Sequence, residues 1–79
     1  MDFYEHNGAL IEVSVLSDGV EGSDGWVVEF WDVTPGGDGE LLHIHFDADG
    51  IATVERVYAS VDQEFINWAL VTARSNLGK

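Results

Sequence analysis

The sequence Phe3-Tyr4-Glu5-His6-Asn7-Gly8-Ala9-Leu10-Ile11-Glu12-Val13-Ser14-Val15-Leu16 contains the strongest turn signal in the chain. Asn7-Gly8 favours a type I′ turn, because that turn requires positive φ at both of its central residues. A two-residue turn places Tyr4 opposite Ile11, and cross-strand partners share one face of a sheet. This segment therefore predicts an antiparallel hairpin whose second strand has two chemically different sides: Ile11, Val13 and Val15 on one, Glu12 and Ser14 on the other.

Two later segments alternate in the same way and predict further strands. Trp26–Val33 is rich in β-branched and aromatic residues, and it has apolar side chains on both of its faces. One face carries Trp26, Val28 and Phe30, and the other carries Val27, Trp31 and Val33 around Glu29. Glu40–Phe46 alternates more cleanly, with Leu42, Ile44 and Phe46 on one side and Leu41, His43 and His45 on the other.

Turn-forming residues separate these segments. Ser17–Gly25 and Thr34–Gly39 are rich in glycine and are expected to be loops. Asp47-Ala48-Asp49-Gly50 favours a type I turn with glycine in the left-handed position. The segment Ile51–Ala59 is therefore expected to return as one more strand.

The last twenty residues have the period of a helix. Ser60-Val61-Asp62-Gln63 matches a capping box, which predicts Ser60 as the residue that caps the helix. Gly78 is the expected terminator. Apolar and small residues then form a broad stripe at helical spacing: Val61, Phe65, Ile66, Ala69, Leu70, Thr72, Ala73 and Leu77.

These elements predict a single α+β domain over residues 1–79. Its expected architecture is an antiparallel β-meander of four to five strands with one C-terminal α-helix packed on one face. One helix covers only one side of such a sheet. The other side is expected to stay open and to carry Phe3, Glu12, Val27, Trp31, Leu41, His43 and His45.

The charge of the chain limits its possible partners. Fifteen acidic residues stand against three basic ones, for a formal net charge of −12. Direct binding of nucleic acid is excluded, because three cations cannot form a basic patch, and attraction to anionic membranes is disfavoured for the same reason. The expected partner is a cationic protein surface. The chain also lacks cysteine, a recognisable signal peptide and a long apolar run, which predicts a cytoplasmic protein.

His43-x-His45 is the main candidate for metal chemistry. Residues two apart on a strand point to the same side, so both imidazoles can reach one ion. Glu12, Glu29 and Asp47 are the third ligands considered, but the pair alone is too unspecific to assign a metal or another cofactor. The acidic turn that begins at Asp47 fails as an EF-hand, because its sixth position is Ala52. No catalytic motif is found, so the chain is not expected to be an enzyme.

The leading hypothesis is a small acidic protein-binding module that inhibits or neutralises a basic, nucleic-acid-binding or nuclease-type partner by occlusion. Immunity proteins and DNA mimics such as anti-CRISPR proteins are the expected kinds. One alternative is a homodimeric structural or accessory protein that pairs through the open sheet face, and another is a His-x-His metal-binding domain. The predicted contact residues are Glu12, Glu29, Trp31, His43 and His45.

Overall fold

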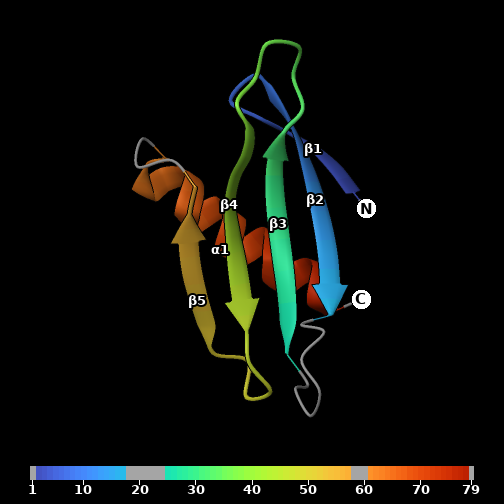
Figure 1. The fold of residues 1–79 in the computed structure, drawn as a ribbon, viewed down its shortest axis with the longest axis vertical. Coiled ribbons are helices and arrows are strands. Elements are labelled where there is room, and N and C mark those ends of the chain that lie inside the picture. The colour runs from blue at the N-terminus through green and yellow to red at the C-terminus, as the bar shows by residue number, and fades with distance from the viewer. Residues whose placement is uncertain (1, 18–24, 58–60, 79) are drawn as a thin grey trace.

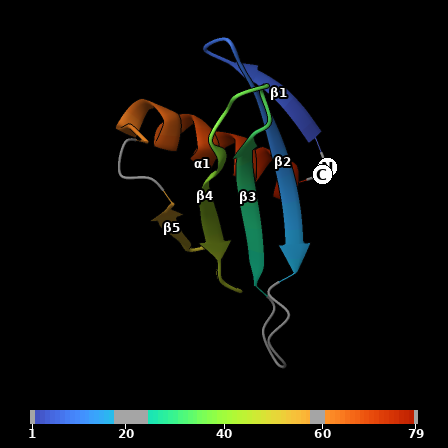
Figure 2. The ribbon, with the colours of Figure 1, turned by 45° about the horizontal axis from the view of Figure 1, so that its top comes forward.

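The computed structural model describes residues 2–17, 25–57 and 61–78 of the chain. These residues form one five-stranded sheet and one helix (Figure 1). The strands follow one another in the sheet in chain order, and each neighbouring pair is antiparallel. The helix lies behind the sheet in both Figure 1 and Figure 2. The elements are β1 (Asp2–His6), β2 (Ala9–Ser17), β3 (Trp26–Asp32), β4 (Gly39–Phe46), β5 (Ala52–Arg56) and α1 (Gln63–Leu77).

This arrangement confirms the predicted α+β meander with a helix packed on one face, and the two predicted hairpin turns are present. Asn7 and Gly8 have φ of 50° and 83°, and Tyr4 pairs with Ile11. In the turn between β4 and β5, the Gly50 amide donates to the Asp47 carbonyl at 2.9 Å, and Gly50 has φ of 80°. The local sequence is therefore sufficient to place both turns.

The hydrophobic core lies between the sheet and α1. Phe30 is fully buried at its centre and meets the rings of Phe65 and Trp68 edge to face, with centroids 6.3 and 5.8 Å apart. Burial of a side chain of this size contributes about 1.5–3 kcal/mol. The remaining core residues are Ile11, Val13, Val28, Leu42, Ile44 and Phe46 from the sheet, and Val61, Ile66, Ala69 and Ala73 from the helical segment.

Trp68 was not part of the predicted helical stripe, yet it packs against this core. Its indole lies 4.3 Å from the His6 ring, nearly stacked on it, and 6.0 Å from the ring of Tyr4. The apolar stripe of α1 is therefore wider than the prediction, and it extends over the β1–β2 hairpin.

The placement of Leu41 on the open face was wrong. The register between β3 and β4 shifts after Phe30, so that Trp31 pairs with Glu40 while Phe30 still pairs with Leu42. Leu41 is the extra residue at this irregularity, and it packs against the core on the helix side. Simple alternation fails here because a β-bulge adds one residue to one strand and turns the side chains that follow.

The prediction for the start of the helix was also wrong. The helix begins at Gln63, and its cap is Asp62, whose Oδ1 accepts a hydrogen bond from the Phe65 amide at 2.9 Å. Ser60 lies outside the described residues. The Gln63 side chain donates forward to Asn67 rather than back to a cap. An aspartate suits this position because its negative charge faces the positive end of the helix dipole.

Other strand boundaries differ by a few residues. β4 already begins at Gly39, which was expected to belong to the preceding loop, and β3 ends at Asp32 rather than at Val33. β5 covers only Ala52–Arg56 of the expected Ile51–Ala59, of which residues 58–60 lie outside the described residues. None of the described helices combines the length and the apolar content needed to cross a membrane.

Candidate protein-binding face

The side of the sheet away from α1, called the open face below, contains all five predicted contact residues. Cross-strand pairing fixes this placement: Glu12 on β2 pairs with Trp31 on β3, and Glu29 on β3 pairs with His43 on β4. His45 lies two residues beyond His43 and points to the same side. Figure 1 looks onto this face, and no described helix or strand lies in front of it. The five residues therefore form one continuous half-buried surface across three strands.

Apolar side chains surround this group. Phe3 is 55% exposed, Leu10 is 42% exposed and Leu16 is 46% exposed. The strand register places all three on the open face, together with the half-buried Val27. These apolar side chains alternate with the carboxylates of the same face, so a partner would meet apolar and acidic groups together.

Within the described residues the arginines lie on one side of the sheet only, whereas carboxylates lie on both sides. The register places five carboxylates on the open face: Glu5, Glu12, Glu29, Glu40 and Glu55. Both described arginines lie on the helix side. Arg56 pairs with the buried Leu42 and donates to the Val61 carbonyl, and Arg74 on α1 lies over the Phe46 ring. Within residues 2–17, 25–57 and 61–78, the open face thus carries acidic side chains and no arginine or lysine.

Trp31 is the aromatic centre of the open face. Its Nε1 donates a long hydrogen bond of 3.4 Å to Oε1 of Glu29, two residues earlier on the same strand. The indole is half-buried and lies beside Glu12 on the neighbouring strand. It is the one tryptophan of this face, since Trp68 packs under the sheet and Trp26 pairs with the core residue Phe46.

The two histidines of β4 meet a carboxylate that the sequence analysis did not name. Glu55 on β5 pairs with His43, and its Oε2 lies 2.8 Å from His43 Nε2. Nitrogen or oxygen atoms of His43, His45 and Glu55 lie within 4.8 Å of one another, which is a set of ligand types suited to a metal ion. The proposed third ligand Asp47 instead accepts hydrogen bonds from the amides of Asp49 and Ile51 in its own turn.

The sequence does contain a signal that identifies Glu55. A hairpin closed by Asp47–Gly50 pairs Phe46 with Ala52, and counting back along both strands brings His43 opposite Glu55. The register of this hairpin, rather than the chemistry of its residues, is therefore the signal that brings Glu55 to His43.

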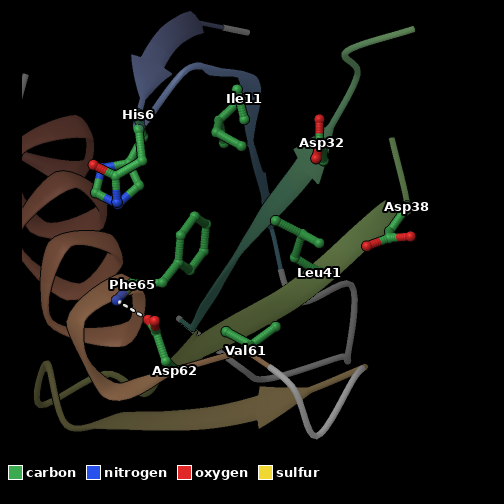
Figure 3. Close-up of a pocket in the computed structure, with 10 residues that line it drawn as sticks. His6, Ile11, Asp32, Asp38, Leu41, Val61, Asp62 and Phe65 are labelled. Atoms are coloured by element: carbon green, nitrogen blue, oxygen red, sulfur yellow. Dashed lines mark hydrogen bonds between the residues drawn. The ribbon is translucent and has the colours of Figure 1, made fainter. Parts of the chain in front are cut away.

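A pocket of about 260 Å³ lies on the other side of the molecule, between the end of the sheet and the first turn of α1 (Figure 3). Its lining combines the apolar side chains of Ile11, Leu41, Val61 and Phe65 with carboxylates and His6. Asp32 and Asp62 accept hydrogen bonds from the amides of Thr34 and Phe65. These two carboxylates stabilise the local backbone, so the open face is the better candidate for binding.

His6, the third histidine of the chain, belongs to this pocket and not to the open face. Its Nε2 lies 3.0 Å from Glu64 Oε2, and its ring is stacked on Trp68. The structure therefore divides the histidines into one that packs against the helix and two that lie together on β4.

Comparison with known proteins does not add to this description. The chain matches no protein-family model, and neither a curated protein nor a solved structure is found similar to it. Any function must therefore be argued from the chemistry of the face itself.

Proposed function

We propose that this chain is a small acidic protein-binding module that docks its open face on a cationic protein. Binding would inhibit or neutralise a nuclease or another nucleic-acid-binding partner by covering its phosphate-binding surface, as an immunity protein or a DNA mimic such as an anti-CRISPR protein does. The observation that carries the proposal is an open face with carboxylates and no arginine among the described residues, because both described arginines lie behind the sheet.

The chemistry of the face suits the two stages of such binding. Glu12 and Glu29 lie beside Trp31, so a cationic surface would meet acidic and aromatic groups together. Opposite charges mainly accelerate and orient the encounter, and they make it sensitive to salt. A central tryptophan supplies the desolvated contact that slows dissociation, and tryptophan is among the residues most enriched in binding hot spots.

A second copy of the chain is the competing occupant, because the apolar residues Phe3, Leu10 and Leu16 are exposed on this face. A two-fold dimer through the open face would bring two acidic faces together, since both copies use the same patch. Like charges at an interface are costly, so a cationic partner is favoured. Light scattering at micromolar concentration distinguishes the two, because only the dimer predicts a doubled mass.

The test begins with capture of basic proteins from lysate on the immobilised chain at low and moderate salt. Each captured protein is then purified and titrated with the free chain, while its bound nucleic acid is followed by fluorescence anisotropy. We expect the chain to displace the nucleic acid. We expect Trp31→Ala to weaken binding by about 30-fold, the equivalent of a hot spot of about 2 kcal/mol.

Charge-matched variants test whether the open face itself makes the contact. Glu12→Gln with Glu29→Gln removes two charges from this face, and Asp49→Asn with Glu64→Gln removes two charges elsewhere. The first pair should slow association and reduce its salt dependence, and the second pair should change both much less. Equal effects of the two pairs, or a captured protein that keeps its nucleic acid at saturation, would overturn the proposal.

A further inference from the structure

His43, His45 and Glu55 form a compact group of metal-ligand side chains within the open face. Both histidines project from the same side of β4, and Glu55 projects toward them from β5. Their candidate ligand atoms all lie within 4.8 Å of one another. The His43 side chain is 26% exposed and that of Glu55 is 58% exposed, so an ion can approach from solvent.

The geometry requires only small side-chain movements to surround an ion. Zinc binds imidazole nitrogen and carboxylate oxygen at about 2.0–2.2 Å, so ligand atoms around a tetrahedral ion lie about 3.3–3.6 Å apart. His43 Nε2 and Glu55 Oε2 are now 2.8 Å apart, and the two histidine rings have centroids 6.0 Å apart. Rotation of the side chains on a fixed backbone can lengthen the distance between His43 Nε2 and Glu55 Oε2 and bring the two histidine rings closer to each other.

A second carboxylate lies near the other ring nitrogen of His43. Oε2 of Glu40 lies 3.9 Å from His43 Nδ1, the ring nitrogen opposite the one that faces Glu55. Histidines that bind metals through one nitrogen commonly direct the other toward a carboxylate, which orients the ring and makes it a stronger ligand. Glu40 occupies that supporting position because the β-bulge at the start of β4 leaves it beside His43 while Leu41 packs inward.

We propose that His43, His45 and Glu55 bind one divalent transition-metal ion, and zinc is the ion used to test the site. Two imidazoles and one carboxylate provide three protein ligands, the number typical of zinc sites that keep a fourth position for water or another ligand. That fourth position would lie on the open face. The inference does not depend on the proposed function, because it concerns the isolated chain and requires no protein partner.

The test is calorimetric titration of the full chain with zinc chloride at neutral pH in excess magnesium. Magnesium occupies scattered carboxylates, because it is a hard ion that prefers oxygen ligands, but it competes poorly for imidazole. We expect one zinc ion to bind per chain. His45→Asn and Glu55→Gln should each weaken zinc binding by at least about tenfold, the lower end of the loss seen when even a supporting residue is removed. Cobalt chloride should give the visible absorption of a tetrahedral site in the wild-type chain but not in His45→Asn or Glu55→Gln.

Two matched variants serve as controls. His6→Asn removes the histidine that pairs with Glu64, and Glu5→Gln removes an open-face carboxylate on β1, away from the cluster. Both should bind zinc like the wild type. Circular dichroism establishes that each variant is folded, and the largely exposed Glu55 offers the substitution least disturbing to the fold. Absence of zinc binding in excess magnesium, or equal loss in the control variants, would overturn the inference, whereas the capture experiment above can fail without affecting it.

Discussion

Phe30 illustrates how strongly one buried residue determines the stability of a small domain. Its ring is fully buried between the sheet and the aromatic residues Phe65 and Trp68 of α1. Phe30→Ala should lower the free energy of unfolding by about 3–5 kcal/mol, because it removes these contacts and leaves a cavity. A domain of 79 residues has a total stability of only about 4–12 kcal/mol. The variant should therefore lose a large share of its stability, which is measured as a lower midpoint in urea titrations followed by circular dichroism.

Phe3→Ala is the matched control, since Phe3 is 55% exposed on the open face. An exposed substitution of this kind usually changes the free energy of unfolding by no more than about 0.5 kcal/mol. Similar losses for the two variants would mean that the core is not centred on Phe30.

Individual residues also show where sequence reasoning reaches the site. Alternation of side chains along a strand was enough to assign five contact residues to one face of the sheet: Glu12, Glu29, Trp31, His43 and His45. Glu55 was missed because its role depends on pairing with another strand, although the turn at Asp47–Gly50 already implies that pairing.

The helix α1 depends on its cap at Asp62. Oδ1 of Asp62 accepts a hydrogen bond from the Phe65 amide at 2.9 Å. Asp62→Ala should reduce the free energy of unfolding by about 1 kcal/mol, because that amide loses its partner in the first turn. The measurement is the urea midpoint at constant slope. Asp62→Asn keeps an oxygen acceptor and should cost much less, so equal losses for Ala and Asn would assign the effect to charge rather than to the cap.

The strand β4 shows the limit of periodicity as a guide. Its alternation predicted Leu41 beside His43, but the irregular pairing next to Trp31 turns Leu41 toward the core. Nothing in the sequence Glu40-Leu41-Leu42 distinguishes a bulge from regular alternation. The preference arises when β3, β4 and the helix pack together, because the additional apolar residue is then buried.

The charge of the whole molecule should influence its stability. With a formal net charge of −12, mutual repulsion among the carboxylates opposes the compact state. Sodium chloride should raise the melting temperature below about 0.2 M, where the screening length falls to about 7–10 Å. Relief of about 1 kcal/mol corresponds to a rise of about 4–8 °C for a domain of this size.

Differential scanning calorimetry at several salt concentrations measures this effect. Glu5→Gln with Asp49→Asn makes the net charge less negative without changing the core. The double variant should show a smaller slope of melting temperature against salt concentration. A melting temperature that stays constant or falls in the wild-type chain would mean that the carboxylates are far enough apart for their repulsion to be negligible.

The sequence pattern alone predicts the strand segments, two turns, the C-terminal helix and the chemical difference between the two faces of the sheet. These features are local, because backbone preferences and side-chain alternation act over a few residues. Four features became known only from the folded structure: the bulge at Leu41, the cap at Asp62, the inward packing of Trp68 and the contact of His43 with Glu55. Each depends on contacts between separate elements, where burial and cross-strand pairing select among conformations that the local sequence leaves nearly equal in energy.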